Sequence, residues 1–385
     1  ALLSFEKLPQ PTITDVTLKV ELFPRERRAA TTGSYRIENR SGAPLQQVHL
    51  RWLRPLKMQR LDVPGATLEK EWTDFDYRIY RFQTPLQPGE SRTVSFATEL
   101  HDVAFRNDNG QRRLVDNGTF LNNIELAPLI GMNRQQLLQD RSKRRKQGLE
   151  PELRMAKLED PAASAHHYLR NDSDWVNAAI TLVTDADQIP VAPGVTVSDT
   201  TVAGRRTLVT RTEAPIHNGF SLQSARYAVE TQEHKGVTLS VYHHRGHEFN
   251  VQRMLDAMAA SIDLFQSAFS PYQFKQARIL EFPAYENFAQ AFAGTMPYSE
   301  GIGFLMKLQG EDKIDMVTYV TAHEVAHQWW AHQVIGADRQ GSTLLSESFA
   351  QYSALLVMEQ LYGKDRVRKF LKYELDYYLR NRGGE

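Results

Sequence analysis

The sequence contains no cysteine, and none of its apolar stretches approaches the ~20 residues of a membrane span. The first absence excludes disulfides, thiolate metal sites and a cysteine nucleophile. An excess of one charge is also lacking, because Lys+Arg and Asp+Glu both number 46. We therefore expect no nucleic-acid partner. The chain lacks an initiator Met and a basic-then-apolar leader, so we expect a processed product or a piece of a longer protein.

The first half of the 385 residues is rich in alternating apolar and polar positions. Between 16 and 22 the apolar residues fall at every second position: Val16, Leu18, Val20 and Leu22. This period of two predicts a strand with one buried face. Similar segments follow, separated by turn signals such as Ser41-Gly42 and Pro88-Gly89. The pattern predicts antiparallel sheets packed as a β-sandwich, which we assign to residues 1–234.

A charged insertion near 131–175 interrupts the strand pattern. Its basic residues at 141–146 would suit an anionic lipid or a partner protein. A solvated loop or an exposed helical turn explains the same charges more simply, and we favour that interpretation.

The hydrophobic period changes after about residue 247. Apolar residues then recur at spacings of three and four: Val251, Met254, Leu255, Met258, Ile262, Phe265 and Phe269. This spacing predicts one amphipathic helix that ends near Ser270-Pro271. A strand-like run at 277–282 and further helical patterns follow. We therefore predict a multi-domain α+β protein with a second domain over 235–385.

The strongest chemical signal is HEVAH, residues 323–327. His323 and His327 are four positions apart in a helical pattern, so both imidazoles can reach one metal ion. Glu324 lies about 100° around the helix, where it can take a proton from a water on that metal. Two helix histidines bonded only to backbone or solvent remain the alternative.

A third metal ligand is expected downstream, because a catalytic zinc takes three protein ligands and keeps one open position. Glu347 lies in LLSESFAQY, 344–352, after a polar, glycine-bearing loop at 334–343. Its apolar neighbours predict that the side chain faces inward, and a buried carboxylate requires a partner. A metal would be that partner.

HEVAHQWW followed by LSESFAQY resembles the zinc signature of the aminopeptidase N family of gluzincin metallopeptidases. The spacer here, 328–346, is one residue longer than usual in the family. The resemblance implies a thermolysin-like α/β catalytic domain over 235–385 and one Zn²⁺ per chain, held by His323, His327 and Glu347, with Glu324 as the catalytic residue. HQWWAHQVIGA and LSESFAQYSAL are also similar to peptidase domains fused to ABC-type permeases. That likeness implies a soluble domain tethered to a membrane permease portion absent from this chain, on the extracytoplasmic side.

A further block of the resemblance lies at 294–304, GTMPYSEGIGF. Family members carry a Gly-x-Met-Glu-Asn loop there, whose Glu holds the free amine of the substrate. Glu300 takes its place, and Gly294, Gly301 and Gly303 would allow the backbone to approach a bound peptide. The implied substrates are peptides with a free N-terminus. An ordinary loop carboxylate remains the alternative for Glu300.

A second group of histidines stands in HHRGHE, at 243, 244 and 247. The group has the density of a metal site, but two of its histidines are adjacent and lie near a strand-to-helix turn. We favour a solvated loop over a second metal site.

Three functions are compatible with these motifs. The first is a zinc metallo-aminopeptidase. The second is an extracytoplasmic zinc-binding assembly or substrate-binding module of a transporter, with weak or no peptidase activity, and the third is an endopeptidase. Family members use a Tyr about sixty residues beyond the third ligand to stabilise the oxyanion. Only 38 residues follow Glu347 (385 − 347), so we expect a catalytic domain truncated at its C-terminal end.

Overall fold

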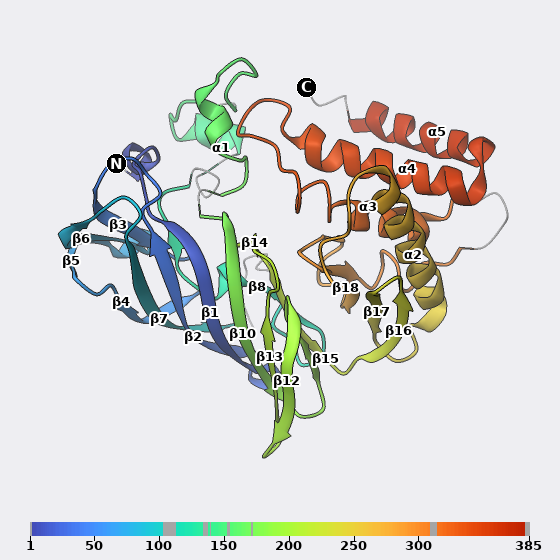
Figure 1. Ribbon diagram of the computed structural model, residues 1–385, viewed down its shortest axis with the longest axis horizontal. Coiled ribbons are helices and arrows are strands. Elements are labelled where there is room, and N and C mark those ends of the chain that lie inside the picture. Colours follow the sequence, from blue (N-terminus) through green and yellow to red (C-terminus); the bar gives the residue numbers. More distant parts are fainter. Residues whose placement is uncertain are drawn as a thin grey trace. The chain divides into compact units, whose positions relative to one another are not determined.

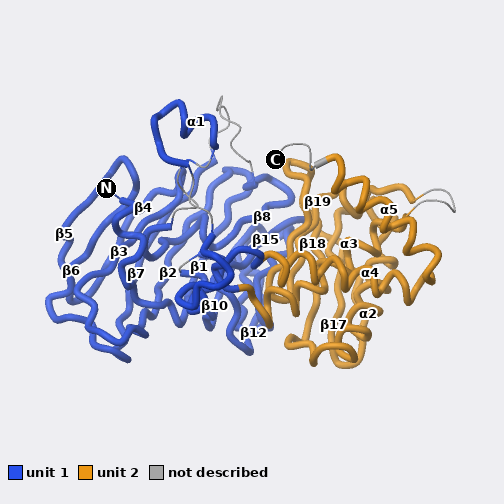
Figure 2. Tube along the Cα trace, turned by 90° about the horizontal axis from the view of Figure 1, so that it is seen from above, with its two compact units in different colours: residues 1–226, 337–342 blue, residues 227–336, 343–385 orange. Residues whose placement is uncertain are grey.

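The chain divides into two compact units in the computed structural model, which describes residues 2–102, 113–133, 138, 140–151, 155–170, 172–308 and 314–381. Unit 1 comprises 1–226 and 337–342, and unit 2 comprises 227–336 and 343–385 (Figure 2). The predicted boundary, 234/235, falls at the end of β16 (Ala228–His234). β16 pairs with β17 (Val237–His243), so residues 228–234 belong with unit 2.

In its described residues, unit 1 consists mainly of strands (Figure 1), which form three sheets. The largest sheet has the order β12 (Val195–Val202), β13 (Arg205–Arg211), β10 (Trp175–Asp185), β1 (Thr12–Phe23), β2 (Arg28–Glu38), β7 (Ser91–His101) and β4 (Lys57–Asp62), with β14 (Ile216–His217) also on β10. A second sheet has the order β11 (Ile189–Val191), β15 (Ser221–Ala225), β8 (Thr119–Asn122). The third has the order β5 (Ala66–Trp72), β6 (Tyr77–Leu86), β3 (Leu45–Arg51), β9 (Leu129–Ile130).

Strand β1 has the burial pattern that its sequence predicts. Val16, Leu18, Val20 and Leu22 are all buried, and the polar residues between them are exposed or half-buried. β1 pairs antiparallel with β2 but parallel with β10, so the large sheet is not purely antiparallel. A parallel pair requires a long connection, and most of unit 1 lies between these two strands. The mixed α+β composition is confirmed, and the packing of the sheets as a sandwich stays a prediction.

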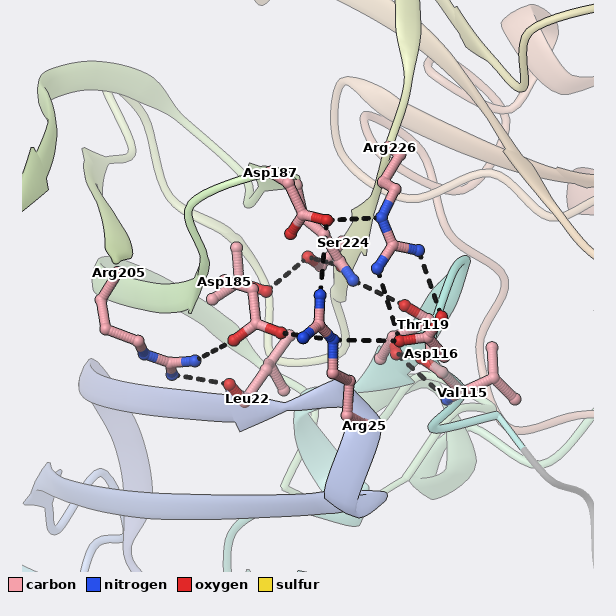
Figure 3. Close-up of polar contacts among 12 residues, drawn as sticks. Leu22, Arg25, Val115, Asp116, Thr119, Asp185, Asp187, Arg205, Ser224 and Arg226 are labelled. Carbon is pink, nitrogen blue, oxygen red and sulfur yellow. Dashed lines mark hydrogen bonds and ion pairs between the residues drawn. The ribbon is translucent and has the colours of Figure 1, made fainter. Parts of the chain in front are cut away.

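An ionic network joins several loops of unit 1 (Figure 3). Arg226, the last residue of the segment 1–226, pairs with Asp187 at 2.6 Å and with Asp116 at 3.2 Å. Arg25 lies 3.8–3.9 Å from three aspartates, but 70% of its side chain is exposed. Exposed pairs contribute little individually. Together these ion pairs hold the loops around Arg226, after which the chain passes from unit 1 into unit 2.

The basic residues of the charged insertion form a short, exposed helix, α1 (Arg141–Lys146). The Asp140 side chain caps it by accepting a hydrogen bond from the backbone amide of Lys143 at 2.7 Å. The favoured prediction, an exposed helical turn, is confirmed for these residues.

The described residues of unit 2 combine one four-stranded sheet with four α-helices. The sheet order is β16, β17, β18 (Gln276–Phe282), β19 (Thr295–Ser299), and the last three strands are parallel. The helices are α2 (Val251–Ala268), α3 (Met316–Ala326), α4 (Phe349–Tyr362) and α5 (Lys364–Asn381). One apolar core joins them, with contributions such as Val241 from β17, Ile279 from β18 and Val325 from α3.

Helix α2 confirms the predicted amphipathic pattern. Its residues at spacings of three and four are buried, including Met254, Met258, Ile262 and Phe265. The ring of Phe265 packs edge-on against Trp329, with ring centroids 5.4 Å apart. This contact fixes α2 against the end of α3, where the histidine motif lies.

Among the described residues, no helix is long and apolar enough to cross a membrane.

Helix α3 begins at a half-buried carboxylate that also joins its neighbours. Asp315 accepts hydrogen bonds from the Thr318 amide at 3.0 Å and from the Tyr362 hydroxyl at 2.6 Å. It also pairs with Arg253 of α2 at 2.5 Å. Burial alone would raise the pKa of Asp315, but these donors outweigh burial and lower it. One residue therefore connects α2, α3 and α4.

We expect Asp315→Ala to destabilise the protein by about 2 kcal/mol, because it removes a helix cap and leaves the hydroxyl of the buried Thr318 without its acceptor. Since the folded-state pKa is lowered, this stabilisation is present above the unfolded pKa near roughly 3.9 and disappears as the pH falls through the folded pKa. Urea unfolding at pH 7 measures the difference. Equal midpoints for Asp315→Ala and the exposed-site control Asp365→Ala would contradict the expectation.

Candidate metal centre

The two histidines of HEVAH lie one turn apart at the C-terminal end of α3. Their Nε2 atoms are 3.1 Å apart, and the rings are perpendicular. Nδ1 of His327 lies 3.0 Å from the carbonyl oxygen of Trp330. A carbonyl can only accept, so Nδ1 carries the proton and Nε2 presents its lone pair beside His323. A backbone carbonyl commonly orients a metal-binding histidine in this way.

Glu347 completes a compact set of three donor atoms. It lies in a single π-helical turn, η8 (Leu344–Ser348), which leads directly into α4. Its Oε2 is 3.5 Å from Nε2 of His323 and 3.7 Å from Nε2 of His327. Tetrahedral zinc with bonds of about 2.0–2.1 Å places its ligand atoms roughly 3.3 Å apart. The donor types and their spacing therefore fit a zinc ion.

The prediction that Glu347 is buried is wrong. Its side chain is 63% exposed, and its neighbour Leu344 is exposed as well. The π-helical turn directs Ser346 and Ala350 into the protein and leaves Glu347 and Ser348 exposed. The hydrogen bond to His323 lowers the pKa of Glu347, so the carboxylate is held as an anion without being enclosed.

Glu324 is the buried carboxylate of the centre. It is 6% exposed, and burial raises its pKa to about 7, although His323 acts in the opposite direction. Within the described part of the chain, neither Oε2 of Glu324 nor Nδ1 of His323 has a hydrogen-bond partner. Leaving such atoms unpaired is costly, so this carboxylate suits proton exchange with a group that enters the site.

Comparison with protein families finds a match within unit 2. Residues 253–381, about a third of the chain, match the model of the peptidase family M1 domain. The M1 domain contains all four residues of the centre, and its family implies Zn²⁺ as the cofactor. The enzyme class is accordingly that of a zinc metallopeptidase.

Solved structures extend the likeness of fold beyond the M1 domain. An M1 zinc metallopeptidase from Deinococcus radiodurans is 16% identical, with a TM-score of 0.61, and the match covers 98% of this chain and 76% of that one. A mutant of that enzyme bound to a Tyr-Ser-Ala substrate is 15% identical, with a TM-score of 0.61, and the match covers 99% and 77%. At this identity the likeness shows the fold alone. No curated protein sequence matches the chain.

The loop between α3 and η8 is held by the charged insertion. The amide of Asp338 donates to the His166 carbonyl at 2.8 Å, and the amide of Gln340 donates to the Ala156 carbonyl at 2.8 Å. Residues 337–342 therefore group with unit 1, although they stand between two parts of the M1 domain. This pairing could not be predicted from the sequence, because the segment carries little periodicity.

Glu300 lies outside the three-atom grouping of the metal centre. It follows β19, and its Oε1 accepts a hydrogen bond from the Ala284 amide at 3.0 Å. Its carboxylate belongs to a second grouping with His244, His247 and Glu281. Glu281 was not foreseen, because a single Glu in a strand-like run has no distinguishing spacing.

The three glycines of the 294–304 block have different roles. Gly294 has a φ of +65°, and its amide donates to the side chain of Gln328, the residue after the ligand His327. Gly303 is buried, and a Cβ there would lie 2.4 Å from the end of Met254. Only Gly301 is exposed. Contacts within the protein therefore explain why glycine stands at 294 and at 303. The hydrogen bond from Gly294 to Gln328 also joins this loop to the end of α3.

The predicted solvated loop at HHRGHE is wrong. His243 is 1% exposed, and His244 and His247 are half-buried. The reason is that β17 ends against β18, so residues that follow β17 pack on the buried Glu281.

Proposed function

We propose that the chain is a zinc-dependent aminopeptidase, which removes residues from the free N-termini of peptides. The M1 domain supports the coarser activity, zinc-dependent hydrolysis of peptide bonds. The observation that carries the proposal is the set of donor atoms from His323, His327 and Glu347, 3.1–3.7 Å apart beside a buried Glu324. Tethering to a permease on the extracytoplasmic side is part of the proposal and is supported by the resemblance alone.

The residues of the centre have distinct tasks in this reaction. When bound, zinc polarises a carbonyl and lowers the pKa of a coordinated water. His323 and His327 would hold it through Nε2, and Glu347 would add a negative charge. A pKa near 7 lets Glu324 accept a proton at neutral pH and return it to the leaving amine.

Selectivity for the N-terminus is the finer part of the proposal. Glu300 would pair with the substrate ammonium, a charge-assisted contact that sets the cleavage point one residue inside the chain. The attachment of the Gly294 loop to Gln328 supports this assignment, because it connects the block containing Glu300 to the zinc helix.

Turnover of aminoacyl chromogenic substrates tests the proposed function. We expect hydrolysis that a chelator abolishes and added Zn²⁺ restores. Folded, zinc-loaded protein without turnover would favour the transporter-associated binding module instead. Equal cleavage of free and amino-terminally blocked peptides would favour an endopeptidase.

We expect Glu300→Ala to raise KM for free-amine substrates by roughly tenfold to a hundredfold, because a charge-assisted hydrogen bond contributes about 1.5–3 kcal/mol. Blocked peptides have no ammonium group and should be little affected. Steady-state kinetics on both substrate types measure the difference, with Glu359→Ala as the control for removing a carboxylate elsewhere in unit 2. Equal increases in KM for both substrate types would remove Glu300 from this role.

A further inference from the structure

The histidine turn after β17 lies at the edge where three parallel strands end. His244 directly follows β17, Glu281 is the penultimate residue of β18, and Glu300 directly follows β19. Because β17, β18 and β19 are parallel neighbours, their carboxyl ends meet at one edge. Side chains that follow such strands converge, and this edge is where open α/β sheets bind ligands.

A tight turn brings the two histidines to the same side. The amide of His247 donates to the carbonyl of His244 at 3.1 Å, and Gly246 supplies the positive φ of 92° within the turn. The two ring centroids are 5.9 Å apart as a result. Two imidazoles separated by two residues and folded together in this way can face one ion.

Glu281 stands at the centre of the group with its side chain fully buried. Its Oε2 accepts a hydrogen bond from the His244 amide at 2.6 Å, and its Oε1 is hydrogen-bonded to Nδ1 of His247. Nδ1 of His244 lies 3.9 Å from the same Oε1. Tyr227 donates to the backbone carbonyl of Glu281 at 2.9 Å and stacks on the His244 ring, so it holds the end of β18 and this ring from outside the group.

The charges of this group favour a cation. The Glu281 side chain is fully buried, and Nε2 of His244 is buried without a hydrogen-bond partner among the described residues. Among the same residues, no Lys or Arg forms an ion pair with Glu281 or Glu300. A buried carboxylate that faces only imidazoles is poorly compensated. A divalent ion would compensate it and take the place of the proton shared with His247.

We propose that His244, His247 and Glu281 form a second divalent transition-metal site, separate from the centre at His323 and His327. One donor atom from each of these residues and one from Glu300 lie within 4.8 Å of one another, a spread that small side-chain rotations reduce to the spacing of metal ligands. Imidazole and carboxylate donors together suit Zn²⁺ and similar ions. Glu300 adds a second negative charge whether or not it ligates the ion, so the site does not depend on its role toward substrate.

Zinc binding in a His327→Ala background tests the site without reference to activity. Apo protein is titrated with Zn²⁺ by equilibrium dialysis, and bound metal is measured by mass spectrometry. We expect one equivalent to bind. Adding His247→Ala should weaken that equivalent by at least about tenfold, since even residues outside the ligand set alter metal affinity by 10–100-fold. A matched control is His234→Ala, because His234 forms a half-buried pair with a single carboxylate, Asp263, and should leave binding unchanged.

A second variant separates loss of the ligand from loss of the fold. Glu281→Gln keeps the shape and can still accept from the His244 amide, but it removes the charge, so it should lose zinc while retaining the native circular dichroism spectrum. No bound zinc in the His327→Ala protein would overturn the proposal. So would unchanged affinity after either His247→Ala or Glu281→Gln. None of these outcomes depends on peptidase activity, so the proposed function could fail while this site stands.

Discussion

Replacing Glu324 by Gln is expected to lower turnover by roughly a thousandfold or more while leaving zinc bound. General acid–base catalysis typically contributes 10²–10⁴-fold, and Gln cannot accept or return a proton. Glu324 is absent from the grouping of metal donor atoms, so its replacement should not remove the ion. Turnover of an aminoacyl chromogenic substrate and zinc content are measured on the same preparation.

Two comparisons sharpen this prediction. Glu359→Gln removes a half-buried carboxylate on α4 that pairs with Lys364, and it should leave turnover and metal unchanged. Glu324→Asp keeps the carboxylate but withdraws it by one methylene, so it should recover part of the activity. If Glu324→Gln turned over like the parent protein, Glu324 would not be the proton acceptor.

The sequence predicted those parts of the fold whose local pattern agrees with their final environment. β1 and α2 each bury the residues that their period places on one face. His323 and His327 were predictable for the same reason, because a helix fixes the distance between positions i and i+4. The structure brings both of them to Glu347, which the sequence placed by the requirement for a third ligand and by the resemblance of LSESFAQY to the family's zinc signature.

The parts that were missed depend on pairing between distant segments. Glu281 lies near the two histidines only because β17, β18 and β19 pair in parallel, and no local spacing in the sequence predicts that pairing. The parallel pairing of β1 with β10 arises in the same way. Glu347 was misjudged because its apolar neighbours were taken as evidence of burial, whereas the π-helical turn directs it outward.

The contrast between Glu324 and Glu347 shows how environment separates two carboxylates within one centre. Burial raises the pKa of Glu324, and the hydrogen bond from His323 lowers that of Glu347. A carboxylate that stays ionised suits coordination, and one with a pKa near neutrality suits proton transfer. Their positions therefore support the proposed assignment of Glu347 as a ligand and Glu324 as the base, in addition to the motif.

Replacing His327 by Ala is expected to remove one equivalent of zinc and to reduce peptidase turnover to background. The change deletes one of three protein donors from the set that includes Nε2 of His323 and Oε2 of Glu347. Loss of residues outside the ligand set already costs about 10–100-fold in metal affinity, so loss of a ligand should cost more. It also leaves a cavity beside Trp330, whose carbonyl loses its partner. Circular dichroism must therefore show that the variant is folded.

His332→Ala is the matched control for this variant. His332 is a buried histidine five residues further along, 6% exposed, and it lies outside the grouping of donor atoms. A general disturbance of the segment after α3 would release zinc from both variants, whereas loss of a ligand would release it only from His327→Ala. Since the second site is expected to keep its own ion, the quantity to compare is the number of equivalents relative to the parent protein. A His327→Ala protein that bound as many equivalents of zinc as the parent protein would show that His327 does not hold the metal. That result would also contradict the proposed hydrolytic role of the centre.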